Sequence, residues 1–83
     1  MNIKKEVIKS ITEISFAEGY LPVGLSQIEL SHNLEDDLGV GEFELVDILS
    51  DLEDKFEVSF DDNEISDFKT VGDIINFIKK AVK

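Results

Sequence analysis

Carboxylates are the side chains of this sequence with the most capacity for chemistry. The 83 residues contain 19 Asp and Glu residues against 8 lysines, with no arginine, and the formal net charge is −11. Twelve of the carboxylates lie between Ser10 and Asp54, a span without a basic residue. A field of this sign repels nucleic acid and anionic lipid and attracts basic protein surfaces. We therefore expect basic protein partners, and neither nucleic-acid binding nor membrane insertion.

One group of carboxylates has the spacing of an exposed helix face, with residues three or four positions apart. Apolar residues recur at the same interval on the other side of the segment, at Leu45, Ile48, Leu49, Leu52 and Phe56. Residues at this spacing share one face, so the segment predicts a helix with an apolar stripe toward a core and a carboxylate stripe toward water. Phe43 and Val46 are expected to widen the buried face. The carboxylate stripe consists of Glu44, Asp47, Asp51 and Asp54.

Two other acidic runs could attract metal ions through oxygen ligands. Neither the run from Glu35 to Asp37 nor the run from Asp61 to Glu64 has the spacing of an EF-hand loop. We expect no specific metal site, and only weak binding of divalent ions at Glu35, Asp36 and Asp37.

Catalytic groups are scarce in this sequence. It has no cysteine and one histidine, His32, in a polar segment, and it has no Ser-His-Asp spacing and no Gly-rich phosphate loop. The protein is therefore not expected to be an enzyme.

Four helical segments can position these groups. The chain is short enough for one domain, residues 1–83. The predicted helices span residues 3 to about 14, 42–56, about 61–65 and 71–83, with a long first loop between the first two. Asp61 with Glu64, and Thr70 with Asp73, have the spacing of capping boxes. The expected fold is all-α, an antiparallel bundle of three main helices and one short helix.

The order of these motifs is similar to that of the acyl carrier protein family. The resemblance rests on Asp37-Leu38-Gly39, the apolar pattern of the second helix, Thr70-Val71 and Asn76-Phe77-Ile78, without a gap from residue 37 to 78. Carriers of this family attach 4′-phosphopantetheine to the serine of Asp-Ser-Leu at the start of the second helix. Here Gly41-Glu42-Phe43 occupies that place, and Glu42 stands at the serine position. We therefore expect no phosphopantetheine and no other cofactor.

Two further observations agree with that expectation. Ser26 follows Gly24-Leu25, but the positions after it that should be apolar are polar, and Ser50 lies inside the second helix. The family tends to have smaller residues where this chain has phenylalanine, and these rings are expected to fill part of the acyl-chain space. They are Phe43, Phe60 and Phe68.

The resemblance implies a carrier-like interaction module. In this family the acidic second helix docks basic patches of enzymes of fatty-acid or polyketide biosynthesis. The resemblance therefore implies that the partner-binding residues are Glu44, Asp47, Asp51, Glu53 and Asp54. One alternative is a working acyl carrier with a non-standard modification or non-covalent acyl binding. Another is an acidic regulator of a synthase or transferase. The first residues do not resemble a signal peptide, and we expect a cytoplasmic monomer.

Overall fold

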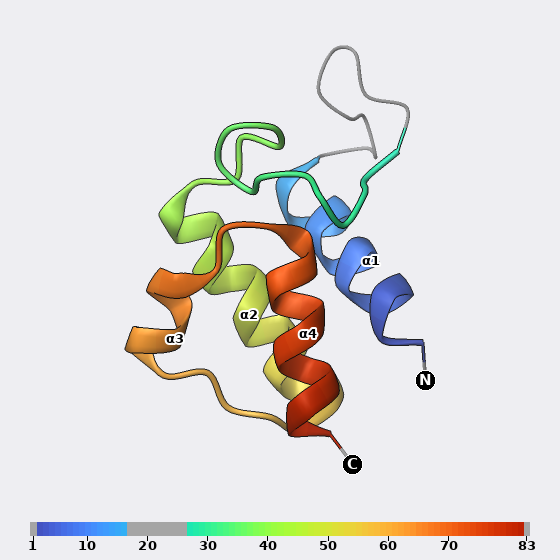
Figure 1. Ribbon diagram of the computed structural model, residues 1–83, viewed down its shortest axis with the longest axis vertical. Coiled ribbons are helices and arrows are strands. Elements are labelled where there is room, and N and C mark those ends of the chain that lie inside the picture. The colour runs from blue at the N-terminus through green and yellow to red at the C-terminus, as the bar shows by residue number, and fades with distance from the viewer. Residues whose placement is uncertain (1, 17–26, 83) are drawn as a thin grey trace.

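The computed structural model describes residues 2–16 and 27–82, and these form four helices (Figure 1). The helices are α1 (Ile3–Ser15), α2 (Glu42–Phe56), α3 (Asp62–Asp67) and α4 (Val71–Ala81). The only sheet-like pairing among the described residues is one isolated bridge between Asn33 and Thr70. The all-α prediction is confirmed, with three main helices and one short one.

The core lies between α1, α2 and α4. Helix α1 packs against both α2 and α4, and α3 lies at the edge of the bundle beside α2 (Figure 1). The fully buried apolar side chains come from all three long helices, at Val7, Ile11, Ile48, Leu49, Leu52, Val71, Ile74 and Ile78. Within the described part of the chain, each helix is too short or too polar to cross a lipid bilayer.

Side-chain caps fix where three of the helices begin. The Asp61 side chain accepts a hydrogen bond from the Glu64 N–H (3.0 Å), and the Glu64 side chain accepts one from the Asp61 N–H (3.2 Å). Thr70 and Asp73 form the same reciprocal pair at the start of α4. Both predicted capping boxes are therefore confirmed. These bonds satisfy backbone N–H donors that a helix leaves free at its first turn. The first helix begins at Asn2, whose Oδ1 accepts from the Lys5 N–H (3.0 Å).

The segment between residues 27 and 41 is tied to the start of α4. The Leu34 N–H donates to the Lys69 carbonyl (2.8 Å), and the Gly72 N–H donates to the Leu30 carbonyl (2.9 Å). Gly39 then takes a left-handed backbone conformation, with φ at 68°, just before α2. These bonds hold the first turn of α2 near the connection between α3 and α4. Residues 17–26, within the expected long first loop, lie outside the described residues.

The structure corrects two predictions about the apolar face of α2. Phe43 and Val46 were expected to widen the buried face, but their residues are 88% and 44% exposed. At about 100° of rotation per residue, Phe43 lies about 160° around the helix from Leu45, on the side opposite the core stripe.

The other two phenylalanines of that prediction, Phe60 and Phe68, do pack inward, and their ring centroids lie 5.7 Å apart. Phe77 joins them to complete an aromatic cluster.

Candidate functional site: the exposed face of α2

The first turn of α2 is capped without a side chain at the capping position. Gly41 precedes the helix, and its N–H donates to Glu44 Oε1 over 3.2 Å. Glu42 and Glu44 lie in the first turn, where carboxylates interact favourably with the positive end of the helix dipole. Val40 is buried and Leu45 packs against the core. These two residues hold the positions of a hydrophobic staple, which fixes the direction in which the chain enters the helix.

The five carboxylates predicted to bind partners differ in their surroundings. Asp47 and Asp54 are exposed and have no hydrogen bond or ion pair with the described residues. Glu44 accepts the capping bond from Gly41. Glu53 Oε2 accepts from the backbone N–H of Phe60 over 2.9 Å and so ties the end of α2 to the segment before α3. Only Asp47 and Asp54 therefore leave the whole carboxylate free for an outside partner.

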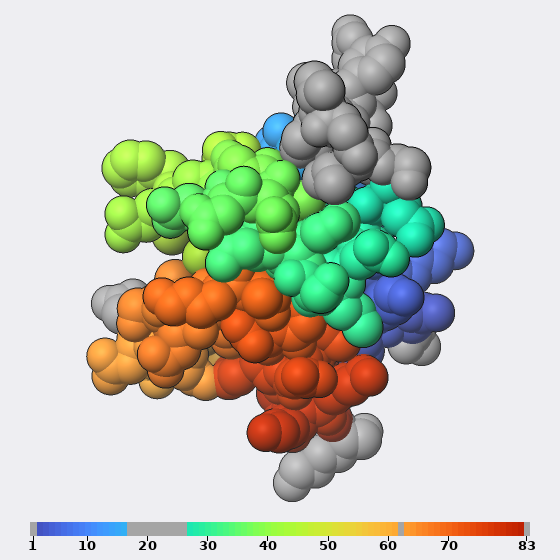
Figure 2. Space-filling view, turned by 45° about the horizontal axis from the view of Figure 1, so that its top comes forward, coloured from blue at the N-terminus to red at the C-terminus, as the bar shows by residue number. Residues whose placement is uncertain are grey.

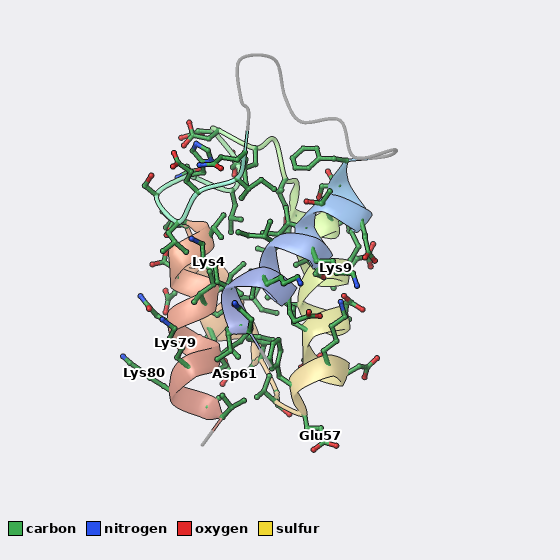
Figure 3. The ribbon with its side chains drawn as sticks, turned by 90° about the vertical axis from the view of Figure 1, so that its right-hand side faces the viewer. Lys4, Lys9, Glu57, Asp61, Lys79 and Lys80 are labelled. Atoms are coloured by element: carbon green, nitrogen blue, oxygen red, sulfur yellow. The ribbon has the colours of Figure 1, made fainter. Side chains whose placement is uncertain are left out.

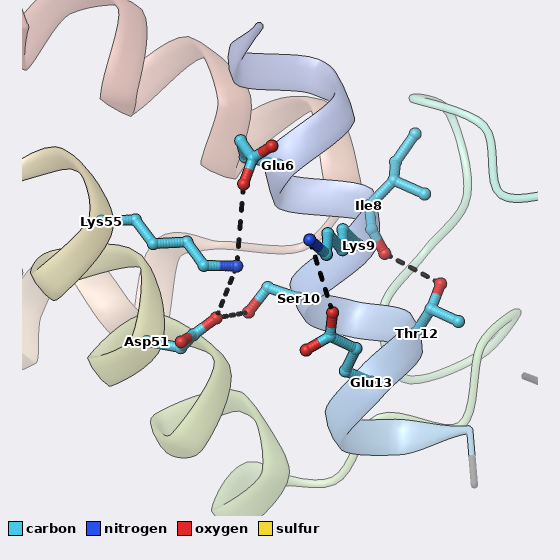
Figure 4. Close-up of polar contacts among 8 residues, drawn as sticks. All are labelled: Glu6, Ile8, Lys9, Ser10, Thr12, Glu13, Asp51 and Lys55. Atoms are coloured by element: carbon cyan, nitrogen blue, oxygen red, sulfur yellow. Dashed lines mark hydrogen bonds and ion pairs between the residues drawn. The ribbon is translucent and has the colours of Figure 1, made fainter. Parts of the chain in front are cut away.

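Asp51 is held in a polar network between α1 and α2 (Figure 4). The hydroxyl of the fully buried Ser10 donates to Asp51 Oδ2 over 2.7 Å. Lys55 Nζ lies 3.2 Å from the same oxygen and 3.8 Å from Glu6 Oε1. The hydrogen bond from Ser10 lowers the pKa of Asp51 below its usual value, burial opposes this shift, and Lys55 adds to the lowering. Asp51 therefore helps to join the two helices.

The sequence contained part of the signal for this network. Asp51 and Lys55 are four residues apart, the spacing at which opposite charges meet on one helix face. Ser10 lies 41 residues earlier, on another helix, and no local pattern links it to Asp51.

A groove of about 560 Å³ lies beside the first turn of α2. Figure 2 shows it as a hollow between the yellow-green start of α2 and the orange residues of α3 and the segment that follows. Its apolar lining includes Val40, Leu45, Val46, Ile65 and Phe68, and its rim carries Glu35, Asp36, Glu42 and Lys69. The groove is open to the surface, and the ring of Phe68 on its wall packs against Phe60 and Phe77.

The acidic run before α2 forms a tight turn. Asn33 Oδ1 accepts from the backbone N–H groups of Glu35 and Asp36, and Asp37 Oδ2 accepts from the Asn33 N–H over 2.7 Å. Glu35, Asp36 and Asp37 are exposed. In the described ranges, no three His, Asp or Glu side chains gather closely enough to hold a metal ion.

Three of the lysines lie away from the exposed face of α2. Lys4 lies on α1, and Lys79 and Lys80 extend from α4 on the side turned away from α2 (Figure 3). Glu57, which follows α2, marks the end of the acidic helix in the same view. Lys55, on α2, pairs with Asp51 and Glu6, and Lys69 lies on the rim of the groove, so charge is only partly separated across the bundle.

Comparisons with known proteins find acyl carriers. A family model described as a phosphopantetheine attachment site matches residues 15–78. An acyl carrier protein from Thermotoga maritima is 35% identical over 82 residues, covering 99% of each chain. One from Kocuria rhizophila is 33% identical over 81 residues, covering 98% of each chain. One from Exiguobacterium sibiricum is 40% identical over 57 residues, or 69% of this chain and 72% of its own.

These matches correct the prediction that the protein has no phosphopantetheine. The matched family model is one of phosphopantetheine attachment, and its relatives are carriers, so the prediction of no prosthetic group is wrong. The residues at the start of α2 do not themselves fit the group. Gly41, Glu42 and Phe43 have no hydroxyl to form a phosphodiester. The hydroxyl that lines the neighbouring groove belongs to Ser66, which donates to the Asn63 carbonyl over 2.9 Å.

The matches to carriers also test the prediction that the protein is not an enzyme. Acyl carrier proteins are non-catalytic, so the prediction that this protein is not an enzyme is confirmed. The family model covers more than half of the chain, two relatives cover nearly all of it, and the four helices follow the order expected from the resemblance. The chain belongs to the acyl carrier protein family.

Proposed function

We propose that this protein is an acyl-carrier-like module that docks enzymes of fatty-acid or polyketide synthesis through the exposed face of α2. Acyl carrier proteins work with biosynthetic enzymes, and the observation that carries the docking proposal is the pair of free carboxylates at Asp47 and Asp54. The proposed partner surface is basic, because both carboxylates are negatively charged and the one lysine of α2, Lys55, is paired with Asp51 and Glu6. The protein acts as a monomer in the cytoplasm, and its net charge of −11 opposes contact between copies.

Exposed charges of this kind act mainly on the rate of encounter. Ion pairs at a wet surface are individually worth about 0.2–1 kcal/mol, so each contact holds the complex weakly. Complementary fields raise the association rate and make it sensitive to salt. The proposal therefore predicts fast, weak docking that slows as ionic strength rises.

Charge reversal tests this docking surface. The variant Asp47→Lys with Asp54→Lys is compared with Glu13→Lys with Asp67→Lys, which changes the net charge equally at exposed residues of α1 and α3. The probes are a purified 3-oxoacyl synthase and a phosphopantetheinyl transferase from the protein's own organism. Association at low salt should slow roughly 10-fold or more for the α2 variant and much less for the control.

Different results of this experiment would contradict different parts of the docking proposal. Equal slowing by both variants would show that net charge matters and the α2 face does not. Absence of binding by the wild-type protein to either probe at low salt would contradict the docking proposal. Circular dichroism should be unchanged in both variants, because all four residues face water.

The start of α2 is the second part of the proposal. Glu42 replaces the attachment serine, so a transferase finds no hydroxyl at this helix start. The variant Gly41→Asp, Glu42→Ser, Phe43→Leu rebuilds the motif and should gain the mass of one phosphopantetheine there after incubation with coenzyme A and a promiscuous transferase. Peptide mapping of the wild-type protein from its native host identifies the residue that carries any group already present. Failure of the folded triple variant to gain mass would contradict this assignment of the motif position.

The groove beside α2 supports a second candidate function, non-covalent binding of an acyl chain. Its apolar lining suits a short acyl chain, and an anionic head has to lie beside Lys69, because Glu35, Asp36 and Glu42 on the same rim repel it. Titration with a short-chain fatty acid should shift amide resonances of Val46, Ile65 and Lys69 and leave those of α1 in place. Shifts spread evenly over the protein would contradict a site in the groove.

A further inference from the structure

His32, the only histidine of the sequence, lies in a turn whose hydrogen bonds need an uncharged imidazole. Its Nδ1 accepts from the backbone N–H of Glu29 over 3.0 Å, and its own N–H donates to the Glu29 carbonyl over 3.1 Å. A ring nitrogen accepts a hydrogen bond only while it carries no proton, so the proton of the neutral ring lies on Nε2. The side chain and the backbone of His32 therefore close this turn together.

The same turn supplies hydrogen-bond acceptors to the start of α4. The Val71 N–H donates to the His32 carbonyl over 3.2 Å, and the Gly72 N–H donates to the Leu30 carbonyl over 2.9 Å. Val71 and Gly72 are the first two residues of α4, and a helix leaves the N–H groups of its first turn without partners of its own. A Cβ atom at Gly72 would lie 3.2 Å from the Leu30 carbonyl oxygen, so the two segments approach closely. A change in the turn therefore reaches α4 through these two bonds.

Buried residues anchor the chain on both sides of the turn. Ile28 is 6% exposed and Leu34 is 3% exposed, and both belong to the core. The residues between them are exposed or half-buried, so little apolar contact holds the turn itself. Segments with few buried contacts open at a low cost in free energy. Loss of one hydrogen bond can therefore open the turn while the bundle stays folded.

Charged groups near the turn come from the turn itself and from the elements beside it. They are Glu29 in the turn, Asp37 in the segment that follows, Lys4 on α1, which lines the same groove as Glu29, and Lys69 and Asp73 at the start of α4. In the part of the chain that the structure describes, the ion pairs involve none of these side chains. The contact that links the charge of the imidazole to the turn is therefore the hydrogen bond at Nδ1.

We propose that this turn is a pH-sensitive switch, in which protonation of His32 removes the acceptor at Nδ1 and releases residues 29–32 from the start of α4. Histidine ordinarily changes its charge between about pH 5 and 8. The charged ring carries a hydrogen on both nitrogens, so Nδ1–H would then face the Glu29 N–H as a second donor. The closed turn binds one proton fewer than the open turn, so it is closed near neutral pH and opens as the pH falls. The switch goes beyond the docking function and does not depend on it.

Nuclear magnetic resonance tests the switch at the ring and at the backbone. At about pH 8, the ¹⁵N shifts of the imidazole should place its proton on Nε2. From about pH 8 to about pH 5.5, protection from hydrogen exchange, corrected for the intrinsic rate, should fall roughly 2- to 10-fold at the amides of Glu29, Val71 and Gly72. The amide of the buried Ile78 should keep its protection. Asp and Glu ordinarily stay ionised over this range, so the change reports the histidine.

Two substitutions separate the imidazole from general effects of acid. Asparagine offers a side-chain oxygen acceptor that does not titrate, so the protection of Glu29 in His32→Asn should not depend on pH over this range. Alanine offers no acceptor, so His32→Ala should show low protection already near neutral pH. Protection of the Ile78 amide shows that each variant is folded.

Three results would overturn the switch. One is a neutral imidazole with its proton on Nδ1. Another is the same fall in protection for wild type and His32→Asn, which would assign the pH dependence to other groups. The third is wild-type protection of Glu29 in His32→Ala, because the backbone bonds alone would then hold the turn.

Discussion

Replacing Ser10 with alanine tests the polar network that joins α1 to α2. Ser10→Ala removes the 2.7 Å bond to Asp51 and leaves no sizeable cavity, since a hydroxyl is exchanged for hydrogen. Hydrogen bonds to charged groups contribute about 1.5–3 kcal/mol to stability. The Asp51 side chain is 37% exposed, so solvent screening reduces the expected loss to about 1 kcal/mol. In a domain of this size that loss lowers the melting temperature by about 4–8 °C.

The size of this loss should depend on pH. The folded-state pKa of Asp51 is lowered from its ordinary value of 3.8, chiefly by the bond from Ser10. A carboxylate with a lowered folded pKa stabilises the fold above its unfolded pKa, and this stabilisation is lost as pH falls through the folded pKa. The difference between wild type and Ser10→Ala should therefore be full near pH 7 and shrink as the pH falls below about 4.

Ser15→Ala provides the matched control for urea denaturation across this pH range. The Ser15 hydroxyl is buried in the same helix without a hydrogen-bond partner among the described residues. Removal of this hydroxyl should be neutral or stabilising. Comparison with Ser15→Ala also corrects the effect of Ser10→Ala for the better helix propensity of alanine. Equal effects of the two variants at pH 7 would refute the reasoning. So would a loss for Ser10→Ala that stays constant down to pH 3.

Three more outcomes test the charge distribution and the backbone. Melting temperature should rise with added salt or millimolar Mg²⁺ near pH 7, because ions screen the repulsion of the excess negative charges; a flat curve would contradict this. Gly39→Ala should destabilise by about 1 kcal/mol since φ is 68° there, whereas Gly39→Asn, with a residue that tolerates this backbone conformation, should lose less; equal denaturation midpoints would contradict it. Asp73→Asn should reduce the free energy of unfolding by about 1 kcal/mol at pH 7 and by less in acid, because hydrogen bonds from the N–H groups of Lys69 and Thr70 lower the pKa of Asp73. Urea denaturation at both pH values measures the difference.

The sequence determined the helices and their starting points because these depend on neighbours in the chain. Capping boxes need partners three residues apart, and both predicted boxes are present at Asp61 and Thr70. The apolar stripe of α2 likewise follows from spacing alone, and Ile48, Leu49 and Leu52 are buried as that spacing requires. The exposure of Phe43 also lay within reach of this reasoning, since its angle from the core stripe follows from the helical repeat.

Tertiary structure decided what each polar group on α2 does. Asp51, Glu53 and Asp54 look alike in the sequence, yet Asp51 binds Ser10 on α1, Glu53 binds the backbone at Phe60, and Asp54 faces water. Packing of one helix against another sets these differences, because a hydrogen bond between residues 41 positions apart depends on how the helices cross. Local spacing carries no record of that crossing, and so only the folded bundle separates the carboxylates that stabilise it from those left free for a partner.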